Sequence, residues 1–158
     1  MIAKLRIRSE QPRTYPACRE QGNHIPDAGK MVDPSQPLVL EIPLRIHSEL
    51  NRQQGKRATW AFYARKKHQR NSVAAHLAQH RGWLDRAANR GAPKLVVTLT
   101  RIGTRKLDGD NLASGFKAVR DAIAQAFCID DGSDRWTWQY DQRIGEYGCE
   151  IRIEAEFR

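Results

Sequence analysis

Four aspartates in the C-terminal half of the chain have the residue type and spacing of a metal-dependent phosphoryl-transfer site. Asp108 and Asp110 follow an apolar segment, and residues two apart in an extended chain point to the same side. Asp130 and Asp131 follow farther along, in a short turn. If that turn folds back beside Asp108, the like charges raise one another's pKa unless a cation neutralises them. Carboxylates without His or Cys suit magnesium or manganese, which can activate water and stabilise a reacting phosphate.

Lys117 is the cation that could serve such a site. The pattern predicts an amphipathic helix over about 111–127, capped by Asp110 or Asn111. At about 100° per residue, Lys117 and Asp121 fall on the polar side, in line with Asp110. Lys117 could therefore neutralise a phosphate. Its alternative role is a surface ion pair with Asp121, which would contribute only about 0.2–0.5 kcal/mol.

Several other segments must position these residues. Helix-compatible sequence at 59–90 predicts two helices that break near Asn71 and Ser72. Strands are predicted from alternating or β-branched sequence, and the last two should pair as a hairpin through the Gly145 region. The aromatic row of the third strand favours core packing over stacking on bases. The predicted strands are 38–44, 94–102, 136–140 and 149–157.

These elements predict an α+β fold, a single domain in which a small mixed β-sheet is packed by helices. The domain is expected to span 37–158. Residues 1–36 contain four prolines and one short alternating run, so they predict an irregular N-terminal arm with at most one edge strand.

The charge of the chain favours a polyanionic partner. Its 158 residues include 27 Lys and Arg against 18 Asp and Glu, which gives a net charge of +9. No acidic residue occurs from Leu50 to Leu84, where basic residues alternate with Trp60, Phe62 and Tyr63. Basic side chains there could contact phosphates, while at least one aromatic is expected in the core. The expected phosphate contacts are Lys56, Arg57, Arg65, Lys66, Lys67 and Arg70.

Membrane and secreted classes are not favoured. No apolar run approaches the roughly 20 residues that span a bilayer, and the N-terminus alternates charged with apolar residues instead of forming a signal peptide. We therefore expect a cytoplasmic protein without a membrane partner. The three cysteines are widely spaced and predict reduced thiols.

Three motifs in order carry a family resemblance. The segments Leu107-Asp108-Gly109-Asp110-Asn111-Leu112, Lys117 to Ile123, and Ile129-Asp130-Asp131 resemble the RusA-type Holliday-junction resolvases of bacteria and their prophages. An upstream loop with Pro43, Ser48 and Asn51 also resembles that family. The similarity is strongest over Leu107–Asp131 and extends more weakly from Leu38 to the C-terminus.

The resemblance implies a homodimer that resolves four-way DNA junctions by paired nicks during recombination and repair. It implies that Asp108, Asp110 and Asp131 bind Mg²⁺. We further expect Asp130 to assist, and Mn²⁺ is a possible substitute because it also accepts carboxylate ligands. Lys117 would be required for cleavage, and Ser48 and Asn51 would contact DNA. Lys117 lies seven residues after Asp110, farther than in compact members, although seven residues still return to the same helix face.

Two other functions remain open. The chain could be a non-catalytic protein of the same fold that binds DNA junctions without a metal requirement. It could also be a metal-dependent phosphoesterase that acts on smaller substrates, because carboxylate clusters serve those reactions too.

Overall fold

The computed structural model describes residues 33–48, 56–89 and 94–157, so most of the predicted N-terminal arm lies outside the described residues. The described part is a small α+β domain with a four-stranded mixed sheet, which confirms the predicted fold class. The strand order is β1-β4-β2-β3. The strands are β1 (Leu38–Ile42), β2 (Lys94–Gly103), β3 (Trp136–Ile144) and β4 (Gly148–Glu156).

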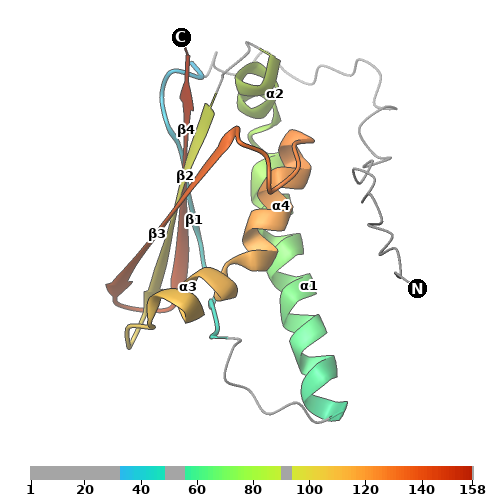
Figure 1. Ribbon diagram of the computed structural model, residues 1–158, viewed down its shortest axis with the longest axis vertical. Coiled ribbons are helices and arrows are strands. Elements are labelled where there is room, and N and C mark those ends of the chain that lie inside the picture. Colours follow the sequence, from blue (N-terminus) through green and yellow to red (C-terminus); the bar gives the residue numbers. More distant parts are fainter. Residues whose placement is uncertain (1–32, 49–55, 90–93, 158) are drawn as a thin grey trace, which may run out of the picture.

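Three of the helices, α1, α2 and α4, lie on one side of this sheet (Figure 1). Strand β1 alternates buried and exposed residues, as expected when only one face is covered. The long helix α1 packs beside α4 over the sheet, while α3 lies at the end of the sheet where β2 finishes (Figure 1). The helices are α1 (Lys56–Ala78), α2 (Arg81–Asn89), α3 (Gly109–Gly115) and α4 (Lys117–Phe127).

The predicted hairpin of the last two strands is wrong. Strand β2 lies between them, parallel to β3 and antiparallel to β4. The chain leaves β3 and crosses the end of β2, where the Gly145 amide donates to the Gly103 carbonyl at 3.2 Å. A Cβ atom at Gly145 would lie 3.0 Å from the Ile102 side chain, and one at Gly148 would lie 3.3 Å from it. These two glycines therefore let the chain pass closely over Ile102.

The helix boundaries differ from the predictions at two places. The first break falls at Gln79–His80, not at Asn71 and Ser72, because Val73 and Leu77 continue the buried stripe of α1 past those polar residues. The predicted 111–127 helix is two helices that meet at Phe116, which is fully buried. The polar faces of α3 and α4 are therefore not one continuous stripe.

The aromatic row of β3 packs on the core, as predicted. Trp136 is buried and stacks on Trp138 with ring centroids 4.9 Å apart, and Tyr140 stacks on Phe116. None of the described helices is both long and apolar enough to cross a membrane.

The prediction of three reduced thiols is wrong for Cys128. This exposed residue, which ends α4 in the left-handed conformation, is disulfide-bonded. An exposed thiol is accessible to oxidation, whereas Cys149 is a buried free thiol whose pKa is raised to about 12 by its burial. Cys18 lies outside the described residues.

Candidate functional site

Asp108 begins α3 and is held by Asn111. Its backbone is extended (φ −68°, ψ 163°), and its carboxylate accepts hydrogen bonds from the backbone N–H and the side-chain amide of Asn111, both at 2.9 Å. Asp108 is therefore the N-cap, and the prediction that Asp110 or Asn111 caps this helix is wrong. Both hydrogen bonds favour the charged carboxylate and lower the pKa of Asp108, the backbone one most. Its exposed carboxylate is thus ionised and oriented.

Two further contacts fix the position of Asp108. Gln142 on β3 accepts from the Leu107 amide at 2.8 Å and donates to the Leu107 carbonyl at 2.7 Å. The Ser48 hydroxyl, from the segment after β1, donates to the Asn111 side-chain oxygen. Nothing local in the sequence marks Gln142, a glutamine on a half-buried strand, as a partner for a loop 35 residues away.

Asp110 lies in the first turn of α3 and is exposed. A carboxylate there interacts favourably with the positive end of the helix dipole. Because Asp108 is extended and Asp110 is helical, the two do not follow the simple extended alternation that the sequence suggested. They nevertheless present two carboxylates at one helix start, directly after the central strand β2.

Lys117 joins α4 to the turn that carries the second pair of aspartates. Its ammonium lies 2.5 Å from the Asp131 carboxylate and 2.8 Å from that of Asp121. Partial burial lowers the pKa of Lys117, but its hydrogen bonds and charge interactions with the two aspartates outweigh burial and raise the pKa overall. The same hydrogen bond from Lys117 is the largest cause of the lowered pKa of Asp131. The ion pair with Asp121, which is the alternative role of Lys117, is present, and Lys117 also bonds Asp131, a predicted site residue.

The turn of Asp130 and Asp131 is held by the aromatic row of β3. The indole N–H of Trp136 donates to the Asp130 carbonyl at 2.9 Å, and that of Trp138 donates to the Asp131 carbonyl at 3.2 Å. The Asp130 carboxylate accepts from the Gly132 amide at 2.9 Å, which closes a local turn. The aromatic residues therefore position the backbone of the turn, while the Asp131 carboxylate points to Lys117.

The predicted nucleic-acid contacts are spread over α1 and the segment before it. Arg70 lies 3.9 Å from Asp121, Lys66 lies over the Phe62 ring at 4.2 Å, Lys67 is exposed and Arg65 is half-buried. Ser48 is engaged with Asn111. Lys56 and Arg57 begin α1, but their side chains, like Asn51, lie outside the described residues.

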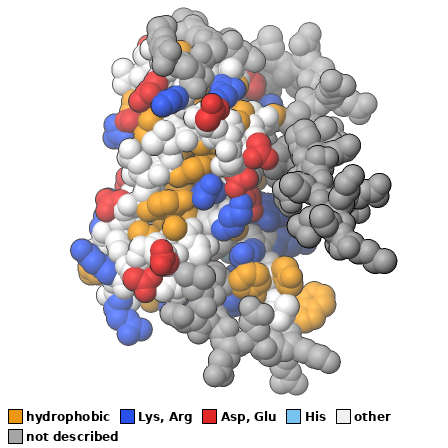
Figure 2. All heavy atoms as spheres, in the orientation of Figure 1, with side chains coloured by type: hydrophobic (Ala, Val, Ile, Leu, Met, Phe, Trp, Pro, Cys, Tyr) orange, Lys and Arg blue, Asp and Glu red, His pale blue; other side chains and the backbone are white. Residues whose placement is uncertain are grey.

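The aromatics of α1 are more exposed than predicted. Trp60 is 81% exposed and Tyr63 is 63% exposed. Hydrophobic side chains gather on the surface in the lower right of Figure 2, in the region of the lower end of α1 in Figure 1. Phe62 is half-buried, and none of the three belongs to the core cluster of the described residues. The expectation that at least one of these three aromatics packs in the core is therefore wrong.

The fit of a divalent cation differs between the two acidic pairs. Mg²⁺ is usually bound through one or two carboxylates, with water and substrate phosphates as its other ligands. Asp108 and Asp110 supply such a pair, and both are exposed. Among the described residues, no three His, Cys, Asp or Glu side chains are grouped to hold a metal ion. Asp131 is instead paired with Lys117, so it would join a metal site only by sharing or releasing that partner.

Searches of protein families, curated proteins and solved structures found nothing that matches this chain.

Proposed function

We propose that the protein is a magnesium-dependent, structure-selective endodeoxyribonuclease that nicks branched DNA, with a Holliday junction as its substrate. The observation that supports it best is the contact between Lys117 and Asp131. These residues are 14 positions apart, come from different motifs, and lie 2.5 Å from each other. The contact joins two of the four residues expected to be catalytic, and Asp108 and Asp110 lie at the start of the preceding helix.

Each residue has a distinct role in this proposal. Asp108 and Asp110 would hold the metal ion, which supplies an activated water and stabilises charge on the phosphate when bound. Asp108 is already ionised and aimed by Asn111, so it needs no reorganisation. Lys117 has three N–H donors, and its contacts with Asp121 and Asp131 leave one for an oxygen of the scissile phosphate. Asp131, assisted by Asp130, would hold Lys117 and contribute to the metal site during the reaction.

Binding of DNA would involve the basic side chains of α1, and paired nicks would require a homodimer that presents two sites to two strands. The net charge of +9 supports association with a polyanion. Mn²⁺ should substitute for Mg²⁺, because both accept carboxylate and water ligands. Such an enzyme would act in the cytoplasm during DNA recombination and repair.

The test is cleavage of a labelled four-way junction with and without Mg²⁺, beside a linear duplex and a fork. We expect paired, metal-dependent nicks in the junction, and we expect Asp110→Asn to abolish cutting while junction binding is largely retained. Asp85→Asn is the matched control, since it removes an exposed carboxylate in α2 that pairs only with Arg81 among the described residues. Equal cutting by Asp110→Asn and the parent protein would contradict the proposal.

A second candidate follows from the acidic groups themselves. Because no three metal-binding side chains are grouped among the described residues, a non-catalytic junction-binding protein fits the same fold. Tight, salt-dependent junction binding without cleavage in Mg²⁺ or Mn²⁺ would favour it. Hydrolysis of a small phosphodiester without any effect on DNA would instead indicate a phosphoesterase.

A further inference from the structure

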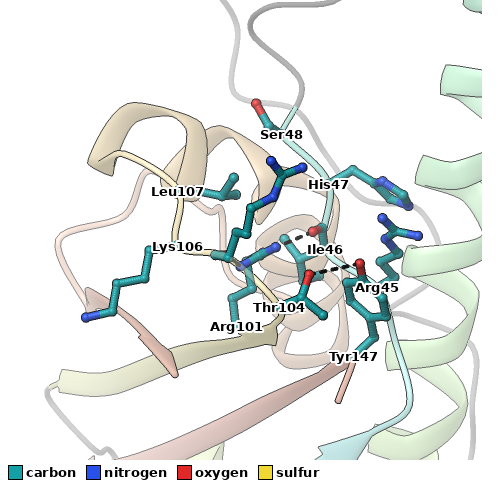
Figure 3. Close-up of a pocket in the computed structure, with 10 residues that line it drawn as sticks. Arg45, Ile46, His47, Ser48, Arg101, Thr104, Lys106, Leu107 and Tyr147 are labelled. Atoms are coloured by element: carbon teal, nitrogen blue, oxygen red, sulfur yellow. Dashed lines mark hydrogen bonds between the residues drawn. The ribbon is translucent and has the colours of Figure 1, made fainter. Parts of the chain in front are cut away.

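A pocket of about 420 Å³ lies beside the α3 start, at the end of β2. Its walls come from the segment after β1, the loop between β2 and α3, and the connection between β3 and β4 (Figure 3). These three segments are distant in sequence. Of its lining residues, only Ser48 and Leu107 belong to the sequence motifs described above.

The pocket is strongly cationic. Four of its ten lining residues are basic, namely Arg45, Arg101, Arg105 and Lys106, and none is acidic. None of these four forms an ion pair with a carboxylate of the described residues. Uncompensated like charges around one cavity repel each other, and a bound anion would relieve that repulsion. Arginine and lysine side chains suit the oxygens of a phosphate in particular.

The base of the pocket is a buried arginine. Arg101 is only 7% exposed and follows Leu95, Val97 and Leu99 on the same face of β2. Its guanidinium donates to the Ile46 carbonyl at 3.2 Å and to the Arg105 carbonyl at 2.7 Å. Arginine has five N–H donors, so these two bonds leave donors for a ligand. Arg101 therefore ties two walls together while it keeps a positive charge at the base.

A glycine makes this placement possible. A Cβ atom at Gly103 would lie 2.7 Å from Nη2 and 2.9 Å from Cζ of Arg101. The guanidinium thus lies against the backbone of Gly103, and a side chain at this position would force the guanidinium to shift.

The rim of the pocket is also ordered. Arg45 lies over the ring of Tyr147 at 4.1 Å, and the Tyr147 hydroxyl lies 3.3 Å from that of Thr104 (Figure 3). The hydrogen bond with Thr104 is the main cause of the lowered Tyr147 pKa, and the positive charges of Arg45, Arg101 and Arg105 lower that pKa further against the effect of burial. The phenol therefore responds to the same positive potential that an anion would meet.

The pocket shares its wall with the candidate active site. Ser48 lines it and donates to Asn111, whose side-chain amide donates to Asp108 at 2.9 Å. Leu107 also lines it and immediately precedes Asp108. A group bound in the pocket would thus be next to the carboxylate proposed to hold the metal.

We propose that this pocket binds an internal backbone phosphate of the DNA strand being cut, one that flanks the scissile phosphodiester. The inference rests on the proposed function for the identity of the strand. It adds a second anchor point to the reaction, which would fix the position of the strand relative to Asp108.

The test uses the full-length protein with the double variant Arg45→Gln/Lys106→Gln. Both side chains are exposed, so folding should be retained, and thermal unfolding checks this. Lys94→Gln/Arg152→Gln is the matched control, because it removes the same two charge types from β2 and β4 outside the pocket. Binding is measured in the Asp110→Asn background, so that cleavage does not disturb the equilibrium.

We expect the pocket variant to bind a four-way junction at least about tenfold more weakly than the control, since charged hydrogen bonds are lost. The slope of log K against log salt should become shallower by about one. Junctions that carry a single neutral methylphosphonate then locate the contact. One internal position should weaken binding by the control but not by the pocket variant.

Two outcomes would overturn the inference. One is an identical affinity and methylphosphonate profile for the pocket variant and its control. The other is that the pocket variant and its control differ in affinity only for DNA that carries a terminal 5′-phosphate. Failure of the proposed function is separate, because it would appear as no metal-dependent nicking by the parent protein, whatever the binding profile.

Discussion

Gln142 holds Leu107 through both of its backbone polar groups, with hydrogen bonds of 2.8 and 2.7 Å. One side chain of β3 thereby fixes the residue that precedes Asp108. Because β3 runs parallel to β2, its far end lies beside the exit of β2, where the loop to α3 begins. This contact connects sheet topology to the geometry of the candidate site.

Replacement of Gln142 should loosen that loop. We expect Gln142→Ala to lower the free energy of unfolding by about 1–3 kcal/mol, since two hydrogen bonds are lost, and to reduce junction cutting more than junction binding. Gln142→Glu retains the acceptor for the Leu107 amide, so its free energy of unfolding and its cutting rate should lie between those of the parent protein and Gln142→Ala. Chemical unfolding and single-turnover cleavage measure the effects. Gln139→Ala, at an exposed position of the same strand, is the control, and an equal loss there would contradict this role of Gln142.

Two glycines of α3 provide a matched pair. A Cβ atom at Gly115 would lie 2.7 Å from the His47 carbonyl oxygen, whereas one at Gly109 would have nothing within 4 Å. Gly115→Ala should therefore destabilise the protein by about 1–3 kcal/mol through overpacking. Gly109→Ala should be neutral or stabilise it by up to about 1 kcal/mol. Thermal unfolding decides, and equal melting temperatures of the two variants would show that α3 does not pack closely on the segment after β1.

The contact between Lys117 and Asp131 predicts that the stability of the fold falls at both high and low pH. The raised pKa of Lys117 contributes stability that is present below its unfolded value of 10.5 and is lost as the pH rises through the folded pKa. The lowered pKa of Asp131 contributes stability that is present above 3.8 and is lost as the pH falls through the folded pKa.

The melting temperature of the parent protein should therefore fall at acidic pH, where Asp131 is protonated, and at alkaline pH, where Lys117 loses its proton. In Lys117→Met both falls should be smaller, because no lysine titrates at high pH and Asp131 has lost its main partner. Lys94→Met is the control for loss of a lysine without an ion pair to a described residue. The same pH profile for Lys117→Met and the parent would contradict the coupling.

Metal binding can be measured without the reaction. At ten times its dissociation constant, Mg²⁺ should stabilise the parent protein by about 1.4 kcal/mol, which raises Tm by roughly 3–6 °C. Asp108→Asn/Asp110→Asn should remove this shift, and Asn at 108 remains a good N-cap. EDTA should reverse the shift, and Asp85→Asn should retain it. An undiminished shift in the double variant would place the metal elsewhere.

Strand positions could be predicted from the sequence because alternation is a local property. The alternating segment of β4 and the apolar β2 were both found, and the aromatic row of β3 was correctly assigned to the sheet. Their order could not be found in this way. Gly145 and Gly148 allow the chain to cross Ile102, and only the fold reveals that crossing.

The single long helix was predicted because residues 111–127 continue one apolar stripe. The structure divides it at Phe116, which is fully buried and stacks on Tyr140 of β3, a contact with a segment farther along the chain. Arg101 did carry a local signal, since it is a charged residue at an inward position of a strand. The pocket around Arg101 could not be predicted, because it forms only where three segments distant in sequence come together.

The sequence by itself determined which reactive side chains the protein has and the periodicity of its strands and helices. These properties include the order of Asp108, Asp110, Lys117 and Asp131 along the chain, and the net positive charge. Those properties depend on neighbours along the chain. The tertiary structure alone decided that β2 is central, that Lys117 pairs with Asp131, and that a cationic pocket borders Asp108. Each of these depends on contacts between segments far apart in sequence, and such contacts are set by which buried faces pack together.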